Sequence, residues 1–280
     1  MFGDLTEKWV SGPGDEPKRN LSDACAIAEI VSRFDVCAIQ ETRRKLTALQ
    51  TVMKILGDDW AYVVTDVTEG GPGNGERLAF VHDRRRARSS GLVGEIVLPA
   101  NANGVVIGPL DRQFARTPYA VSFSAGANAF TLVTLHALYG ASKADKERRR
   151  DELAAIAQWL ADRADDPDAF NRNLIALGDF NIDRDGDPLY EALTSTGLAA
   201  PPQLQDVPRN ITYADGGPKK HYDQIAWFTK GNRAKLTLRY DDTAGYVEWT
   251  KYLLQHARSD AQRKAHISDH YPLWAEFSRS

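Results

Sequence analysis

Short apolar runs recur along this chain, and they set narrow limits on how it can fold. Each run is four to seven residues long, and segments with glycine, proline, asparagine or aspartate separate many of them. This is the pattern of buried β-strands separated by turns. The runs predicted to form strands are 36–39, 61–66, 78–82, 94–98, 119–123, 130–135, 174–177, 222–228, 235–240 and 273–277.

Amphipathic segments interrupt these runs and predict helices. One helix is expected over 22–33, and a second ends at Gly57. Ser142, with Asp145 three residues later, begins a long helix, and 188–196 forms a short one. Because strands outnumber helices and many are adjacent, we expect an α/β protein with two packed β-sheets flanked by helices. The pattern alone does not separate this arrangement from a three-layer α/β sheet.

The chain is long enough for one large domain, and we predict a single domain over 1–280 with a loop-like start over 1–20. No repeat or low-complexity tract divides it. No run approaches transmembrane length, and the first twenty residues lack a signal-type apolar stretch. We therefore expect a cytoplasmic monomer, with secretion an alternative if a signal segment has been lost from the N-terminus.

Net charge limits the partners of the chain. The formal charge is −3 and the pI is about 6.1, so the protein is not a generally basic nucleic-acid binder. Two arginine runs, 84–88 and 148–150, are interpreted as solvated faces. Cys25 and Cys37 are interpreted as small buried hydrophobic residues and not as a disulfide or zinc site.

Oxygen-bearing side chains follow or precede three of the apolar runs. Glu41 follows the first run, Asp179 and Asn181 follow 174–177, and Asp269 precedes the last. Charged groups at the ends of buried strands are costly unless they are paired or bind a metal. Hard oxygen ligands suit Mg²⁺, which needs only one or two carboxylates.

Two histidines occupy comparable positions. His136 ends the run 130–135, and His270 follows Asp269. Histidine acts as a general acid or base near neutral pH when a carboxylate orients it. Asp223 and Glu76 are the candidate orienting groups.

In this order, the motifs of the chain resemble the endonuclease/exonuclease/phosphatase superfamily, and within it the deoxyribonuclease I-like branch. The resemblance covers about residues 21–278. It is carried by Gln40-Glu41-Thr42-Arg43, Glu76-Arg77-Leu78, Phe114–Pro118, Leu135-His136, Gly178-Asp179-Phe180-Asn181, Tyr222–Ile225 and Ser268-Asp269-His270-Tyr271-Pro272.

This resemblance implies a four-layer α/β-sandwich and roles for individual residues. A metal, Mg²⁺ with Mn²⁺ or Ca²⁺ as alternatives, would be held chiefly by Glu41, with Asp269, Asp179 and Asn181 nearby. His270 with Asp223, and His136 with Glu76, would share the acid–base work, and Asp179 and Asn181 would belong to the same catalytic group. The residues implied to contact the substrate are Asn181, Arg116, Tyr222 and, in a DNA groove, Arg43.

The chain departs from the family pattern in three places. The family opens with a core strand that ends in an asparagine, and Met1-Phe2-Gly3 stands about where that strand would have ended. We therefore expect an unpaired sheet edge and a weaker metal site. Asn74 occupies the position of a DNA-stacking tyrosine, and 241–267 is an extra segment.

The function expected from these residues is hydrolysis of a phosphodiester, with water attacking phosphorus and no covalent enzyme intermediate. The leading hypothesis is a DNA endonuclease with little sequence specificity. The first alternative is a phosphatase or phosphodiesterase acting on inositol phosphates or lipid head groups. The second is an inactive binding module, favoured only if the absent first strand disables the site.

Overall fold

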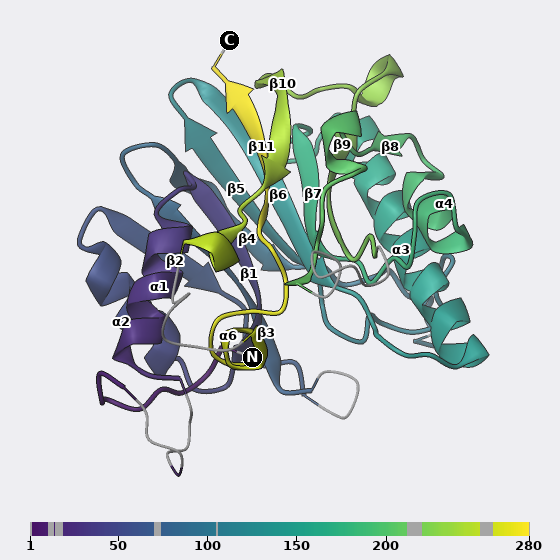
Figure 1. The fold of residues 1–280 in the computed structure, drawn as a ribbon. Coiled ribbons are helices and arrows are strands. Elements are labelled where there is room, and N and C mark those ends of the chain that lie inside the picture. Colours follow the sequence, from purple (N-terminus) through teal and green to yellow (C-terminus); the bar gives the residue numbers. More distant parts are fainter. Residues whose placement is uncertain are drawn as a thin grey trace.

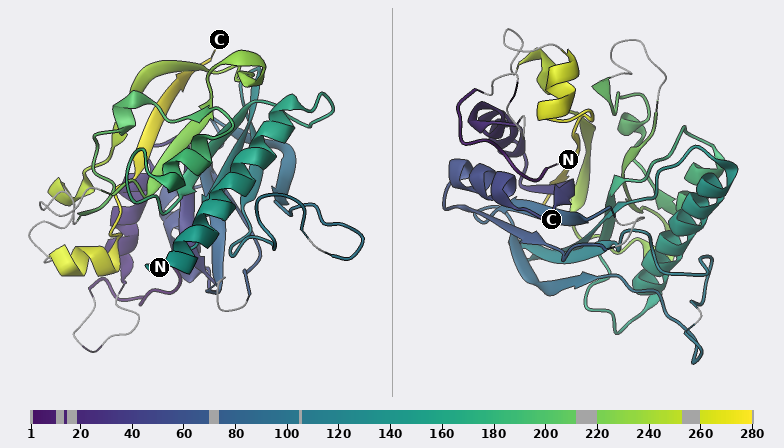
Figure 2. Two further views of the ribbon diagram at one scale, coloured as in Figure 1. Left: turned by 90° about the vertical axis from the view of Figure 1, so that its right-hand side faces the viewer. Right: turned by 90° about the horizontal axis from the view of Figure 1, so that it is seen from below.

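The computed structural model describes residues 2–10, 14, 19–69, 74–104, 106–211, 220–252 and 260–279. Within this part of the chain, helices and strands form four layers, with two sheets in the middle and helices outside them (Figures 1 and 2). The expected α/β-sandwich is confirmed. None of the described helices combines the length and apolar character needed to cross a membrane.

One sheet has six strands in the order β4-β5-β6-β7-β9-β8. Only the β6–β7 pair in it is parallel. Its strands are β4 (Arg88–Glu95), β5 (Tyr119–Ala125), β6 (Asn128–His136), β7 (Leu174–Asp179), β9 (Asp223–Phe228) and β8 (Leu198–Ala199). The outer face of this sheet is covered by α3 (Lys143–Asp165) and α4 (Pro188–Thr194).

The other sheet layer consists of two separate pieces. One is the three-stranded sheet β1-β3-β2, and the other is the antiparallel pair β10-β11. The elements are β1 (Val36–Arg43), β2 (Trp60–Val64), β3 (Glu76–Asp83), β10 (Arg239–Tyr246) and β11 (Leu273–Ser278), with α1 (Leu21–Val31) and α2 (Thr47–Leu56) outside. Three short 3₁₀ turns, η1 (Pro202–Leu204), η2 (Gly231–Arg233) and η3 (Trp249–Lys251), and the helix α6 (Asp260–His266) complete the described elements.

The alternation of β3 explains why two sheets and a helical layer pack together. Leu78 and Phe80 point into the core between the sheets, whereas Ala79 and Val81 point into the core beneath α1 and α2. Successive strand residues face opposite sides, so the continuous apolar run Leu78–Val81 supports two cores. A third core joins the six-stranded sheet to α3 and α4.

Helix starts follow the capping chemistry of the sequence. Ser142 caps α3, and Asp145 completes the capping box, as predicted. For α1 the cap is Asn20, paired with Asp23, and not Ser22. α2 ends at Gly57, as predicted.

Beyond its pairing with β3, β1 has one further backbone bridge within the described residues. Phe2 forms a parallel bridge with Thr42; its N–H donates to Glu41 at 2.8 Å and its C=O accepts from Arg43 at 3.0 Å. Elsewhere in the described residues, β1 pairs only with β3. A cavity of about 1170 Å³ lies between β1 and β11, and both strands line it.

Two predicted strands are placed differently in the structure. β4 covers Arg88–Glu95 and not 94–98, and β10 covers Arg239–Tyr246 and not 235–240. Both are edge strands in which exposed residues alternate with partly buried ones, so their polar residues hide the apolar pattern on which the prediction relied. β10 therefore takes up the start of the segment 241–267.

The end of that segment docks on the first helix. Nδ1 of His266, in α6, lies 2.9 Å from Oδ2 of Asp23, and both side chains are buried. Nε of Arg19 donates to the backbone O of His266 at 2.7 Å. Within the loop-like start, 2–10 has no helix or strand beyond the bridge at Phe2. Residues 11–13, 15–18 and 253–259 lie outside the described part.

Candidate active site

The register of the six-stranded sheet aligns three predicted site residues. β6 and β7 run parallel, so their carboxyl ends meet at one edge, where His136 lies opposite Asp179. β9 runs antiparallel to β7 and begins with Asp223, which is also opposite Asp179. Strand pairing therefore brings together side chains that are far apart in the sequence.

Gly178 allows this alignment to be close. Its φ is +139°, and a Cβ at this position would lie 2.3 Å from the carbonyl oxygen of Leu135. That distance is well below van der Waals contact, so only glycine lets β7 approach β6 in this way. The glycine of the Gly178-Asp179-Phe180-Asn181 motif thus positions Asp179 beside His136.

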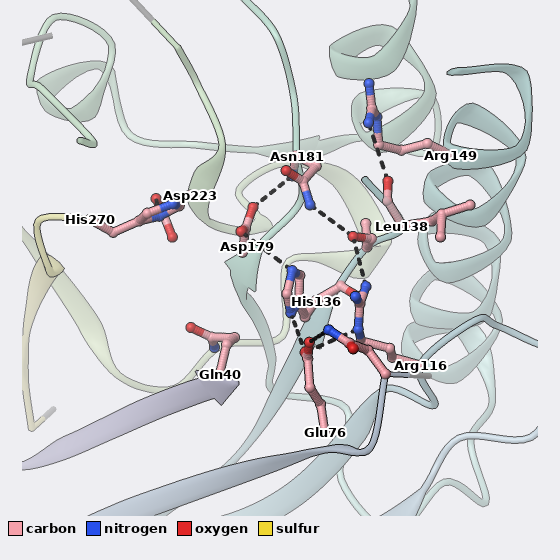
Figure 3. Close-up of polar contacts among 12 residues, drawn as sticks. Gln40, Glu76, Arg116, His136, Leu138, Arg149, Asp179, Asn181, Asp223 and His270 are labelled. Atoms are coloured by element: carbon pink, nitrogen blue, oxygen red, sulfur yellow. Dashed lines mark hydrogen bonds and ion pairs between the residues drawn. The ribbon is translucent and has the colours of Figure 1, made fainter. Parts of the chain in front are cut away.

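The first histidine–carboxylate pair is His136 with Glu76, as predicted (Figure 3). Nδ1 of His136 lies 2.8 Å from Oε2 of Glu76, and Nε of Arg116 lies 3.0 Å from the same oxygen. Asn74 donates its side-chain amide to Oε1 at 2.8 Å. Burial acts to raise the pKa of Glu76, but the hydrogen bond and charge of His136 and the charge of Arg116 hold that pKa below its usual value. Nε2 of His136 faces Asp179 at 3.7 Å.

The second pair is His270 with Asp223, also as predicted. Nδ1 of His270 lies 2.7 Å from Oδ2 of Asp223, and the ring of Tyr222 stacks on the imidazole with centroids 5.9 Å apart. Burial acts to lower the pKa of His270, but the charge of Asp223 and its hydrogen bond raise that pKa well above the usual value. The His270 side chain keeps 27% of its surface exposed, against 6% for His136.

Arg209 supports the second pair from behind. It is fully buried, and its Nε donates to the backbone O of Asp223 at 3.3 Å. Its own carbonyl accepts from the N–H of Tyr271, while Asp269 accepts from Ile211. The chain before and after His270 is therefore held by backbone pairing. Nothing in the sequence around Arg209 distinguished it.

Asn181 closes the row of strand-end groups. Its backbone has a positive φ of 51°, and its N–H donates to Oδ1 of Asp179 at 2.9 Å. Its side-chain amide donates to the carbonyl of Ala137 at 2.8 Å, and Arg116 approaches the same carbonyl at 3.4 Å. Arg116 and Asn181, predicted to hold the phosphate, are thus brought to one side of His136.

A divalent cation fits the side chains beside the first pair. Glu41, Glu76 and His136 offer ligand atoms that lie within 4.8 Å of one another. Glu41 has a positive φ of 58° and sits at a bulge that displaces the register of β1. Carboxylate oxygens with one imidazole suit a hard divalent cation. The donor set includes the predicted Glu41 and adds Glu76 and His136.

Two of the other three predicted metal ligands line the cavity between β1 and β11. Asp179 and Asp269 line the cavity together with Glu41 and His270. Asp269 is exposed, whereas Asp179 is 9% exposed. Asn181 binds Asp179 and Ala137, as described above. In this geometry the compact ligand group contains Glu41 alone of the four predicted ligands.

Arg43 and Tyr222, both predicted to contact the substrate, lie beside the two histidine–carboxylate pairs. Arg43 donates to the backbone O of Asn74, next to the Glu76 pair. Tyr222 lies over His270. Gln40, which the sequence analysis named only as part of a motif, donates its side-chain amide to Oγ1 of Thr134 at 2.9 Å. Figure 3 shows its side chain near those of Glu76 and His136.

The interpretation of 148–150 as a solvated face was wrong for its middle residue. Arg149 is 1% exposed, and it donates to the carbonyls of Leu138 and Gly140 at 3.2 and 3.4 Å. It therefore lies behind the strand end that carries His136. By contrast, Arg85 and Arg86 of the other run are exposed and pair with surface carboxylates.

Two packed sheets carry, at one edge, two histidine–carboxylate pairs and a group of side chains that could hold a divalent cation. This combination suits the hydrolysis of phosphate esters. The chain belongs to the Endonuclease/Exonuclease/phosphatase family, whose model matches residues 10–270. Members of this family hydrolyse phosphate esters. A search among curated proteins found no match.

Solved structures of the same superfamily share the fold. A family member from Bacteroides thetaiotaomicron has a TM-score of 0.65 at 17% identity, over 98% of this chain and 95% of that one. A mannosyl-6-phosphatase from the same species has a TM-score of 0.60 at 15% identity, over 98% and 97%. D. rerio TDP2, complexed with a single-strand DNA product, has a TM-score of 0.58 at 14% identity, over 92% of each chain.

Proposed function

We propose that the protein is a Mg²⁺-dependent phosphodiesterase that cleaves DNA with little sequence specificity. The observation that supports this most is the pairing of His136 with Glu76 and of His270 with Asp223 on either side of Asp179. Two oriented histidines can serve a reaction in which water loses a proton and the leaving oxygen gains one. The structural relative complexed with a single-strand DNA product is in keeping with a nucleic-acid substrate.

The two histidines differ in their access to water, and this difference assigns their roles. His270 is the more exposed, and Asp223 increases the affinity of its imidazole for a proton. We assign to it the removal of the proton from the attacking water. His136 is enclosed between Glu76 and Asp179, and we assign to it the delivery of a proton to the leaving oxygen.

The remaining side chains hold the phosphate and its charge. Arg116 and Asn181 meet at the carbonyl of Ala137, where they can face the anionic oxygens. Glu41, with Asp179 and Asp269 around the same cavity, would hold Mg²⁺ and leave His136 free to protonate the leaving oxygen. The ion, when bound, would neutralise charge that develops on the phosphate. Hydrogen bonds from preorganised donors stabilise that charge more in the transition state than in the ground state.

The test uses two substrates and two variants. Plasmid DNA and bis-p-nitrophenyl phosphate are incubated with Mg²⁺ or with EDTA. We expect EDTA to abolish turnover of both substrates. We also expect His270→Ala to lower both rates by about 10²–10⁴-fold.

The two substrates differ in their leaving groups, and this difference distinguishes the roles of the two histidines. Nitrophenolate is a good leaving group that needs little protonation, so His136→Ala should slow plasmid cleavage much more than it slows hydrolysis of the nitrophenyl ester. Equal losses of His136→Ala on both substrates would refute the assigned roles. Absence of turnover of either substrate with any divalent metal would refute the proposed function.

A second candidate is hydrolysis of phosphate from a phosphorylated small molecule, such as an inositol phosphate. The near-neutral net charge and the phosphatase among the structural relatives favour it. Release of inorganic phosphate from inositol phosphates, with plasmid left intact, would replace the first proposal by this one. Arg43→Ala adds a further distinction, since a DNA contact predicts loss on plasmid and not on the nitrophenyl ester.

A further inference from the structure

Three basic side chains converge on one carboxylate next to the active site. Nζ of Lys220 lies 2.8 Å from Oδ1 of Asp183. Nζ of Lys146 and a terminal nitrogen of Arg149 lie 3.5 and 3.7 Å from Oδ2. One carboxylate compensates one positive charge, so the group keeps a net positive charge.

Asp183, Lys146 and Lys220 border a hollow of about 810 Å³ between the start of α3 and the loop after β7, here called the α3 hollow. Basic side chains outnumber acidic ones around it. Of the acids, Glu147 lies 3.8 Å from Lys143, and Asp187 caps α4 by accepting from Leu189 and Tyr190. The charged residues that line the hollow are Lys143, Lys146, Glu147, Arg150, Asp183, Arg184, Asp187 and Lys220.

The placement of these cations is unfavourable for stability alone. Lys143 and Lys146 lie in the first turn or so of α3, where the helix dipole already gives a positive potential. A cation there loses about 0.3–1 kcal/mol relative to a neutral residue. Arg149 is almost fully buried, and burial of a guanidinium is costly. Asp183 and two carbonyls compensate Arg149, whereas an anion in the hollow would offset the cost at the two lysines.

Side-chain contacts connect the lining of the hollow with the proposed catalytic groups. Nζ of Lys220 lies 5.7 Å from the ring centroid of Tyr222, which in turn stacks on His270. Arg149 donates to Leu138, one residue after the carbonyl that accepts from Asn181. Figure 3 shows Arg149 beyond Asn181, on the side away from Glu76.

We propose that the α3 hollow binds a second phosphate of a nucleic-acid strand, adjacent to the phosphate that is cleaved. This inference rests on the proposed function and defines its substrate further. The ring of Tyr139 supports a nucleic acid over other anions: it is 61% exposed and lies under the guanidinium of Arg149 at 5.9 Å. An exposed aromatic beside a cationic groove is the arrangement on which unpaired bases stack.

The experiment compares substrates with one phosphate and with several. For wild type, Lys146→Met and Lys146→Met/Lys220→Met, kcat/KM is measured on bis-p-nitrophenyl phosphate and on a single-stranded oligonucleotide. Methionine keeps the aliphatic stem and removes the charge. We expect the ratio of the two kcat/KM values to fall at least about tenfold in the double variant, through KM. The dependence of log KM on log salt should also become shallower by about 0.7 for one lost phosphate contact. Lys54→Met, on the exposed end of α2, is the matched control and should leave the ratio unchanged.

Asp183→Asn should change KM in the opposite direction and distinguishes phosphate binding from a purely structural role. Removal of the compensating carboxylate should lower KM for the oligonucleotide, whereas a structural defect would raise it. Thermal melting verifies that each variant is folded. An unchanged ratio in folded Lys146→Met/Lys220→Met, or a higher KM in folded Asp183→Asn, would overturn the proposal.

A binding assay keeps this test independent of catalysis. If wild type turned over no substrate, the proposed function would fail, and the hollow would be tested by fluorescence anisotropy of a labelled oligonucleotide in EDTA. Weaker binding by the double variant would then support the site. Equal binding of the oligonucleotide by wild type and the double variant would overturn the assignment to nucleic acid.

Discussion

Replacement of Glu76 by glutamine would test whether this carboxylate is the electrostatic centre of the first pair. The Glu76 side chain is 2% exposed, and its Oε2 is shared by Arg116 and His136, whose side chains are 9% and 6% exposed. The variant keeps the shape of the side chain but leaves the guanidinium of Arg116 buried without a negative partner. Loss of one partner from a buried ion pair costs about 3–5 kcal/mol, so we expect the free energy of unfolding to fall by about that amount.

Urea denaturation followed by tryptophan fluorescence measures this loss. Asn74→Ala is the matched control, because it removes a neutral donor to the other oxygen of Glu76 and should cost only about 1 kcal/mol. A Glu76→Gln variant within about 1 kcal/mol of wild type would refute the reasoning. It would show that Arg116 is compensated by other groups.

The pH dependence of the same measurement gives an independent check of sign. The pKa of folded Glu76 lies below its usual value of 4.5. The folded state therefore binds fewer protons than the unfolded state as the pH falls through this region. The stabilisation by the carboxylate is fully present above about pH 4.5 and is lost below it. The difference in stability between wild type and Glu76→Gln should accordingly shrink on acidification, and a constant difference would contradict the pKa shift.

Three further predictions concern the sheets and the second pair. Gly178→Ala should lower the free energy of unfolding by about 1–3 kcal/mol or more, since the added Cβ meets the Leu135 carbonyl; a melting temperature equal to wild type would contradict it. If His270 accepts the proton of water, kcat/KM should still rise with pH above pH 6.5, because the pKa of His270 is raised. Asp223→Asn should move this rise in kcat/KM to lower pH. A rise that stays at the same pH would show that another group titrates there. An apolar segment attached ahead of Phe2, as long as the eight residues of β1, should pair with the open edge of β1 and raise the melting temperature by several degrees. A control segment with alternating prolines, which cannot donate to the ladder, should give no increase.

Much of the fold could be predicted from the sequence because its central strands are apolar on both faces. β3, β5, β6 and β7 are buried along most of their length, so continuous apolar runs mark them clearly. β4 and β10 are edge strands that expose many of their residues, and their boundaries were misjudged.

The sequence shows which residues belong to the site more readily than it shows which of them pair. His136 and Glu76 are 60 residues apart, and His270 and Asp223 are 47 apart. Both pairings were inferred from the family resemblance, since polar residues at strand ends show only that such groups gather at one edge. Which groups gather most closely depends on backbone detail: the bulge at Glu41 turns this residue toward Glu76 and His136, and no sequence pattern specified that.

Arg149 shows that a sequence signal can be present and still be missed. Counted as part of an arginine run, it resembles its solvated neighbours. Counted along the helix, it lies in phase with Leu153, Ile156 and Leu160, which form the buried stripe of α3, because residues spaced by three or four share one face. A charge in phase with an apolar stripe is costly unless it is compensated. Here the compensation comes from Asp183 and from two carbonyls after the strand that ends in His136. The position of Arg149 on the buried face of α3 therefore predicts a polar partner near the active site.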